Sequence, residues 1–98
     1  MKVKIHKGTR YVVAICDSSI FGKKFEEGNM QLDLTGKFFD GKEAGEKEIR
    51  EIIKDMKRED ACFNIAGEES VKLGKEMGII KKEGIIKIEK IPVALILM

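Results

Sequence analysis

The sequence predicts an α+β fold, in which a mostly antiparallel sheet of about six strands has two helices packed on one face. Segments that alternate apolar and polar residues, as half-buried strands do, recur along the chain, and two other segments repeat their apolar residues at helical spacing. The 98 residues suffice for one hydrophobic core, and no linker, internal repeat or low-complexity stretch divides them. We therefore expect residues 1–98 to form a single domain.

The first two predicted strands form a β-hairpin. Lys2 to His6 alternates basic and aliphatic residues, whereas Tyr11 to Cys16 is almost entirely apolar, as expected for a strand that is buried on both faces. A two-residue turn at Gly8-Thr9 would place His6 opposite Tyr11. In that register, one face of the hairpin combines basic side chains with an aromatic ring.

The next stretch contains a loop followed by a third strand. Ile20 to Gly28 fits neither the helical nor the strand period, so we interpret it as a loop. Met30 to Leu34 alternates again and predicts a strand. Because loops between glycines often carry function, the end of this loop is a candidate site, with a solvated turn as the alternative. The candidate residues there are Phe25, Glu26, Glu27 and Gly28.

Glu46 to Lys57 has the clearest helical pattern in the chain. Acidic residues crowd its start and basic residues its end, as the helix dipole favours. One apolar stripe runs along it, and charged residues occupy the other positions, so we expect the stripe to pack on the sheet. The stripe consists of Ile49, Ile52, Ile53 and Met56.

Asp60 to Gly78 combines a further strand with the second helix. Ala61 to Ala66 predicts a buried strand, Gly67 a turn, and Glu68 to Met77 a helix. A helix that starts after a glycine resembles a phosphate site, but the two glutamates that open this helix would repel a phosphate and already satisfy the dipole. We therefore interpret this junction as structural.

Two more strands end the chain. Ile85 to Glu89 and Ile91 to Leu97 both predict strands, although the break at Glu89-Lys90 is short enough that they could form one bent ribbon. The second segment is apolar on both faces. Such a strand either runs through the centre of the sheet, which we favour, or packs against another subunit. A homo-oligomer formed through this carboxyl-terminal strand is the alternative that the pattern leaves open.

The composition restricts the class of protein. Hydrophobic residues make up 43% of the chain and charged residues 37%, while the net charge of +2 is too small for bulk charge to predict nucleic-acid binding. Lysine, glutamate and isoleucine are abundant and the amides are scarce, a bias associated with proteins from very hot habitats. The longest apolar run is far shorter than the roughly 20 residues of a membrane span. We expect a cytoplasmic protein without a membrane partner.

No catalytic, metal or cofactor site is predicted. One histidine and two distant cysteines lack the number and spacing of zinc ligands, and no pattern brings an acid, a base and a nucleophile together. An enzymatic function would have to use the carboxylates of the Phe21 to Gly28 loop.

The amino-terminal hairpin is the strongest candidate for a binding site. Basic residues on a strand face beside an aromatic ring are the elements of single-stranded RNA binding, in which cations contact phosphates and the ring stacks on a base. The alternative is the solvated face of an edge hairpin. The candidate RNA-binding residues are Lys2, Lys4, His6, Lys7, Arg10 and Tyr11.

Several short motifs, in this order and at these separations, resemble the uncharacterised archaeal family catalogued as domain of unknown function 424. The resemblance covers nearly the whole chain and implies an archaeal cytosolic protein, sometimes suspected of RNA binding or of a role near translation. It implies no catalytic residue. The motifs are Phe21-Gly22-Lys23-Lys24-Phe25-Glu26-Glu27-Gly28, Leu32-Asp33-Leu34, Phe38-Phe39-Asp40-Gly41, Asn64 with Gly67-Glu68, and Ile91-Pro92.

Three classes of function follow from these observations. The favoured one is an RNA-binding or translation-associated accessory factor, with RNA or the translation machinery as its partner. The second is a protein-interaction or assembly module without catalytic activity, and the third is a small enzyme that uses the loop carboxylates.

Overall fold

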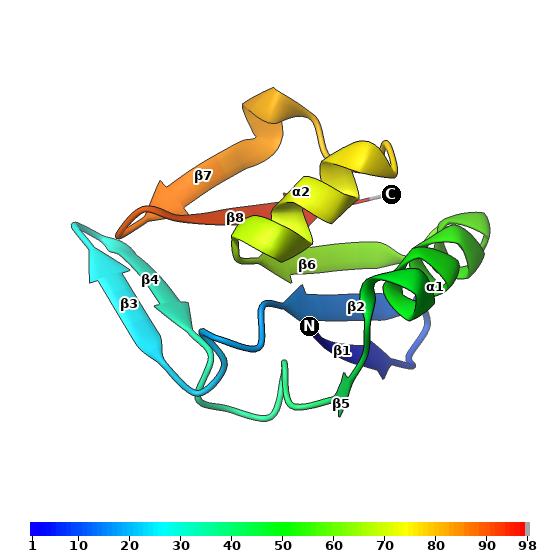
Figure 1. The fold of residues 1–98 in the computed structure, drawn as a ribbon, viewed down its shortest axis with the longest axis horizontal. Coiled ribbons are helices and arrows are strands. Elements are labelled where there is room, and N and C mark those ends of the chain that lie inside the picture. The colour runs from blue at the N-terminus through cyan, green and yellow to red at the C-terminus, as the bar shows by residue number, and fades with distance from the viewer. Residues whose placement is uncertain (98) are drawn as a thin grey trace.

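A six-stranded sheet forms the centre of the structure, and both α-helices lie on one of its faces (Figure 1). The computed structural model describes residues 1–97. In chain order the elements are β1 (Lys2–His6), β2 (Val12–Cys16), β3 (Lys24–Glu27), β4 (Met30–Asp33), β5 (Lys42–Glu43), α1 (Glu46–Arg58), β6 (Cys62–Ala66), α2 (Glu68–Glu76), the short 3-10 helix η1 (Lys82–Gly84), β7 (Ile85–Ile88) and β8 (Ile91–Ile96).

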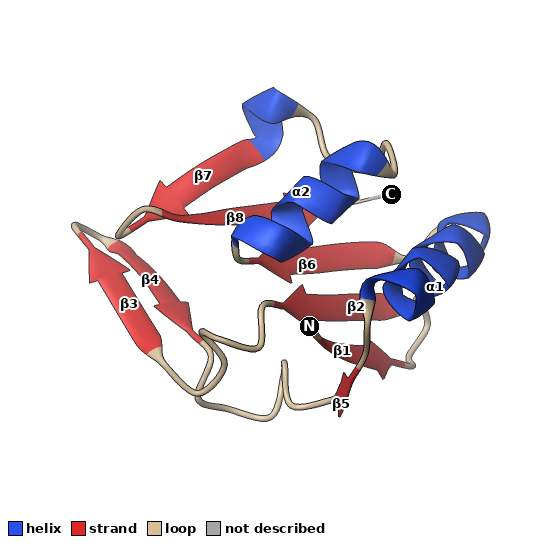
Figure 2. Ribbon diagram, viewed as in Figure 1, coloured by secondary structure: helices blue, strands red, loops and turns tan. Residues whose placement is uncertain are grey.

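The strand order of the main sheet is β5-β1-β2-β6-β8-β7. Neighbouring strands are antiparallel except for β2 and β6, which are parallel. Strands β3 and β4 form a separate antiparallel hairpin at the end of the main sheet where β7 and β8 are joined (Figure 2). The predicted α+β fold, with a mostly antiparallel sheet and two helices on one face, is confirmed.

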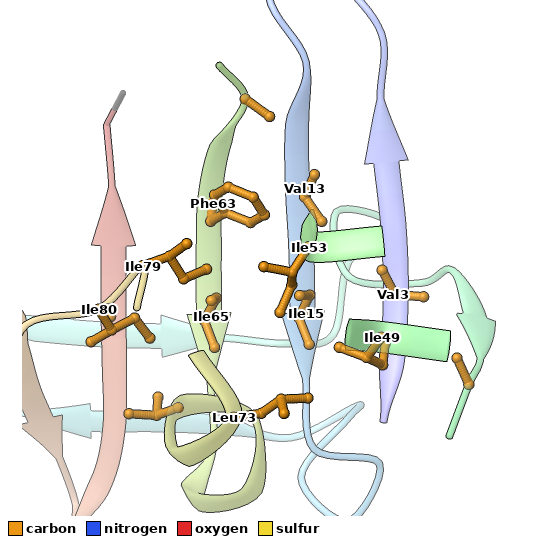
Figure 3. Packing of buried hydrophobic residues seen from close by; sticks show 14 residues of the cluster. Val3, Val13, Ile15, Ile49, Ile53, Phe63, Ile65, Leu73, Ile79 and Ile80 are labelled. Atoms are coloured by element: carbon orange, nitrogen blue, oxygen red, sulfur yellow. The ribbon is translucent and has the colours of Figure 1, made fainter. Parts of the chain in front are cut away.

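The covered face of the sheet, which lies under α1 and α2, carries the larger hydrophobic cluster (Figure 3). Alternate residues of β2 and β6 point to this face, and α1 contributes Ile49 and Ile53 from its predicted apolar stripe. Phe63 is fully buried in this cluster. Because β2 and β6 are buried on both faces, their sequences are apolar runs and do not alternate.

The helix-free face of the sheet carries a second, smaller cluster. Ala14 and Cys16 of β2 reach it from the sheet, and the β2–β3 connection, the β3–β4 hairpin and residues 34–41 cover it. The covering side chains that are buried are Ile20, Leu32, Leu34 and Phe39.

The helix α2 is anchored by a carboxylate from a distant strand end. Asp17, directly after β2, is buried and accepts hydrogen bonds from the main-chain N–H of Glu69 (3.0 Å) and of Ser70 (2.8 Å) and from the Ser70 hydroxyl (2.7 Å). Gly67 adopts a φ of 109°, and a Cβ atom there would lie 2.3 Å from the Asp17 carboxyl carbon. The predicted structural role of this junction is therefore explained by Asp17, which occupies the positive end of the helix dipole.

The carboxyl-terminal strand lies inside the sheet, as we favoured. β8 pairs with β6 on one side and with β7 on the other. Glu89 and Lys90 form a tight turn between β7 and β8, with φ of 51° and 71°, which resolves them as a hairpin.

Two predictions about local structure are wrong. The stretch interpreted as the loop Ile20 to Gly28 contains strand β3, in which Phe25 pairs with Leu32 and packs on the second cluster. In the amino-terminal hairpin, His6 pairs with Val12 and not with Tyr11, because residues 7–11 form a longer turn than expected. The Tyr11 ring packs on the covered-face cluster, and its burial there sets this register.

None of the helices within residues 1–97 has both the length and the apolar composition to cross a membrane.

Candidate nucleic-acid interface

Three of the predicted RNA-binding residues share the helix-free face of β1. Lys2, Lys4 and His6 pair with β2 residues that point to the second cluster, so their side chains emerge on the same side. Residues 37–41 run over this side of β1 and contact all three of them.

Lys2 is held by this covering segment. Its ammonium lies 3.4 Å from an Asp40 carboxylate oxygen and 4.5 Å from the centre of the Phe21 ring. The side chain keeps 19% of its exposure. Lys2 therefore fixes the segment to the sheet, and little of its charge faces solvent.

Lys4 and His6 bind the main chain of the segment. The Lys4 ammonium donates to the carbonyl oxygen of Lys37 (3.1 Å), and His6 Nε2 lies 2.9 Å from the carbonyl oxygen of Phe38. Because a carbonyl oxygen accepts and cannot donate, Nε2 carries the hydrogen in this contact. These bonds hold both side chains in defined positions at the surface.

The His6 ring is stacked on the Phe38 ring. The ring centres are 4.6 Å apart and the planes are inclined by 15°. Phe38 remains 42% exposed, whereas Phe39 is buried in the second cluster and meets Phe38 edge-on at 5.2 Å. The buried ring anchors the segment, and the exposed ring is presented to solvent. We call the group Lys4, His6, Lys37 and Phe38 the His6–Phe38 surface.

Tyr11 lies on the opposite face of the sheet from His6. It packs on the covered-face cluster, with the ammonium of Lys7 5.9 Å from its ring centre. The prediction that Tyr11 supplies the aromatic ring beside Lys4 and His6 is therefore wrong. Phe38 takes that position.

Arg10 lies near the His6–Phe38 surface, because it contacts a residue in the same cross-strand row as His6. Its guanidinium lies 3.9 Å from the Cys62 sulfur. Cys62 pairs with Val12, which pairs with His6, so the three residues form a row across β6, β2 and β1. With strands about 4.8 Å apart, Cys62 and His6 are separated by roughly 10 Å.

The chain reaches this arrangement by crossing the edge of β1 at Gly41. A Cβ atom at Gly41 would lie 1.8 Å from the Val3 carbonyl oxygen, so glycine is required for the close approach. Residues before Gly41 lie on the helix-free face, and residues after it form β5 at the sheet edge.

Sequence reasoning missed Phe38 and Lys37 as members of the site. They lie more than thirty positions from the strand that they contact. The available signal was the pair of consecutive phenylalanines in a glycine-rich connection, since two large rings in one loop require a partner surface.

The candidate functional residues Phe25, Glu26, Glu27 and Gly28 belong to the β3–β4 hairpin. The Glu27 carboxylate accepts from the main-chain N–H of Glu89 (2.6 Å), and the Glu89 carboxylate accepts from the main-chain N–H of Glu26 (2.7 Å). Gly28, with a φ of 60°, forms the hairpin turn. These reciprocal bonds join the hairpin to the β7–β8 turn, which is a structural use of the carboxylates.

The buried thiol of Cys16 is unreactive. Burial, followed by the nearby Asp17 carboxylate, raises the pKa of Cys16 to about 11. The thiol is therefore neutral near pH 7, and a neutral thiol is a poor nucleophile.

Three large aliphatic side chains are exposed on the helix-free face, at the edge of the sheet away from β1. Ile86 is 51% exposed, Leu95 59% and Leu97 73%. Ile86 pairs with Val93, and Leu95 and Leu97 follow at alternate positions, so all three point to the same side.

A model of the family described as "Protein of unknown function (DUF424)" matches residues 6–98. Among solved structures, the fold is similar to the crystal structure of an uncharacterized conserved protein from Methanopyrus kandleri. The TM-score is 0.77 and the sequence identity 23%, with 97% of this chain and 88% of that chain covered. No curated protein matches the chain.

Proposed function

We propose that this chain, which belongs to the family described as Protein of unknown function (DUF424), binds single-stranded RNA through the His6–Phe38 surface, as an RNA-binding or translation-associated accessory factor. The observation that supports the proposal is an exposed phenylalanine ring, stacked on a histidine and flanked by lysines on the helix-free side of β1. Aromatic rings of this kind stack on bases, and neighbouring cations follow the phosphates.

Each residue has a distinct part in the proposed binding. Phe38 presents one ring face to a base, and His6 supports its other face. Lys37 and Arg10 are exposed and offer further cations, while Lys4 is held beside the stack by its bond to the Lys37 carbonyl. With about three cations at phosphates, the logarithm of the binding constant should fall with the logarithm of the salt concentration with a slope of roughly −2.

Fluorescence anisotropy with a labelled single-stranded RNA of mixed sequence tests the proposal. Phe38→Leu should weaken binding about tenfold, because it removes the stacking face, and Phe38→Tyr should retain it. Lys37→Glu should weaken binding and reduce the salt slope, whereas Lys54→Glu, a matched charge reversal on the exposed side of α1, should change neither.

The proposal fails if Lys37→Glu and Lys54→Glu bind alike, or if Phe38→Leu binds as the unmodified protein does. Double-stranded RNA of the same sequence serves as a second control. Its bases are paired and cannot stack on Phe38, so tighter binding to the duplex would also contradict this mode of recognition.

A second candidate function is a protein-interaction or assembly module. It is supported by the exposed aliphatic group Ile86, Leu95 and Leu97, since contiguous apolar surface of this kind marks many protein contacts. A homo-oligomer through β8 would be detected as a concentration-dependent mass by light scattering. Leu95→Glu should abolish it, and Met30→Glu, at an exposed apolar residue of the β3–β4 hairpin, should not. A monomer at millimolar concentration would contradict self-assembly.

A further inference from the structure

The outer edge of β1 is paired along only part of its length. Strand β5 pairs with Lys2 and Val3, and the chain then leaves the edge at Gly41. Gly41 lies against Lys4, and among residues 1–97 no strand continues the pairing beside Ile5 and His6.

The main chain of Ile5 points toward this unpaired edge. The Met1 carbonyl accepts from the Ala44 N–H (2.8 Å) on the β5 side, and N–H and C=O groups alternate sides along a strand. The main-chain N–H and C=O groups of the odd-numbered residues of β1 therefore point to the outer edge of the sheet. On β2, the Tyr11 carbonyl accepts from the Cys62 N–H, so the even-numbered residues of β2 face β1, which agrees with this assignment.

An apolar cavity adjoins the same edge. Its volume is about 360 Å³, and Ile5 at its rim is 41% exposed. The cavity lies between the edge of β1 and helix α1. Its lining residues are Val3, Lys4, Ile5, Gly41, Lys42 and Ile52.

We propose that this edge binds an extended segment of a partner protein, which adds to the sheet as a strand beside Ile5. Main-chain hydrogen bonds to an edge supply affinity in this mode of recognition, and side-chain pockets supply specificity. The residue of the segment opposite Ile5 places its side chain on the covered face, beside Ile5 and Ile52 in the cavity. An aliphatic side chain fits that position.

The flanking residues of the segment are acidic. They point to the helix-free face, where β1 presents Lys4 and His6 and the covering segment presents the exposed Lys37. On the α1 side of the cavity, Glu48 is already paired with Lys42. The partner segment is thus one in which acidic and aliphatic residues alternate.

A second copy of this chain is disfavoured as the occupant. Antiparallel pairing of two β1 edges about Ile5 would place Lys4 of one copy opposite His6 of the other, with further lysines nearby. Lysines on a strand edge commonly prevent such self-association.

The proposal is tested with a synthetic peptide of alternating glutamate and valine residues and blocked ends, titrated into the 15N-labelled protein. We expect saturable shifts at Ile5 and its neighbours, and slower exchange of the Ile5 amide hydrogen when the peptide is bound. A peptide with lysine in place of glutamate should bind at least about tenfold more weakly, since like charges would then face each other. Equal binding of the two peptides, or shifts confined to other edges, would overturn the proposal.

Ile5→Pro removes the Ile5 N–H, which points to the outer edge. The hydrogen bonds between β1 and β2 stay intact, as an edge position allows. It should weaken peptide binding roughly three- to tenfold, the effect of losing one hydrogen bond. Lys87→Pro at the other edge of the sheet is the matched control and should not change binding. If Ile5→Pro fails to fold, N-methylation of the peptide valines removes the reciprocal bond, in which the valine N–H donates to the Ile5 carbonyl oxygen. Unchanged binding after N-methylation would contradict strand addition.

This inference does not depend on RNA binding. Phe38→Leu tests the RNA surface and leaves the Ile5 main chain in place, whereas Ile5→Pro acts at the edge. The two proposals can therefore fail separately.

Discussion

The two faces of the main sheet are closed in different ways. The covered face is packed by both α-helices, and its cluster includes Phe63, Ile49 and Ile53, each with no exposed surface. The helix-free face is covered by the β3–β4 hairpin and by the irregular segment of residues 34–41. The part of this face that carries Ile86, Leu95 and Leu97 is exposed. This difference indicates that stability resides mainly on the covered face, which leaves the other face able to expose an aromatic ring, cations and aliphatic side chains.

The irregular segment is attached to the helix-free face by specific polar contacts as well as by apolar burial. Asp40, the Lys37 carbonyl and the Phe38 carbonyl all contact β1 side chains, and Phe39 is buried beneath them. Polar contacts at an exposed site each stabilise the fold weakly, because water competes for the same groups. The segment should therefore open at a lower free energy than either helix.

Truncating one phenylalanine on each face gives the largest expected difference. Phe63→Ala should lower the free energy of unfolding by about 3–5 kcal/mol, because the cavity that it leaves is enclosed on all sides. Phe39 belongs to a segment that can collapse onto the sheet after truncation, so the loss for Phe39→Ala should be smaller, about 2 kcal/mol. Urea unfolding of both variants measures the difference. Equal losses would mean that both faces are equally rigid.

Substitution at the Asp17–Gly67 junction should detach α2 from the covered face. Gly67→Ala combines a positive φ with a clash against Asp17, and we expect a loss of about 2–4 kcal/mol. Gly78→Ala, with a φ of 79° and open space around it, carries the backbone strain alone and should lose about 1 kcal/mol. Thermal unfolding compares them. Similar losses for the two variants would show that the Asp17 contact contributes little.

Gly41→Ala should loosen the helix-free face with less effect on the whole fold. The added methyl group meets the backbone of Val3, so the crossing segment must shift, at a cost of about 1–3 kcal/mol. The His6 ring should then lose its stack on Phe38, seen as a changed chemical shift of the imidazole protons in NMR spectra. Gly36→Ala, which meets nothing within 4 Å, is the control and should leave that shift unchanged.

Local periodicity was sufficient to predict most of the fold. The bounds of β1 and the starts of α1 and α2 agree with the sequence pattern, because in these segments the buried residues repeat at one clear period. β3 was missed because Phe25 is its single partly buried residue, so no alternation marks it. The hairpin register depended on which face buries Tyr11, and that is decided by packing against elements far along the chain.

The candidate site was less predictable than the fold. Lys4 and His6 were identified from strand alternation, but their contacts with Lys37 and Phe38 join positions more than thirty residues apart. The same holds for Asp17 and Ser70, whose bond spans fifty-three positions. Single-sequence reasoning identifies faces and ends of elements, whereas such pairings depend on how the irregular segments cross the sheet.

Lowering the pH should destabilise mainly the helix-free side of the fold. This is the smallest effect that we predict. Hydrogen bonds from the Ser18 hydroxyl, and then from the terminal amine, hold the pKa of Glu43 below its ordinary value of 4.5. The Thr35 hydroxyl and N–H hold the pKa of Asp33 below 3.8. Because the folded-state pKa values are lowered, these carboxylates stabilise the fold above their ordinary pKa values, and the contribution is lost as the pH falls through the folded values.

Ser18→Ala isolates the Glu43 contribution. At pH 6 the variant should melt slightly below the unmodified protein, because its Glu43 carboxylate has lost the hydroxyl donor. As the pH falls below 4.5 and then through the lowered pKa of Glu43 in the unmodified protein, Glu43 becomes protonated in both proteins, so the difference between their melting temperatures should shrink toward zero. Ser19→Ala, at the exposed neighbouring residue, should show no such convergence. A difference that stays constant or grows in acid would mean that Ser18 stabilises the fold by some route other than the Glu43 carboxylate.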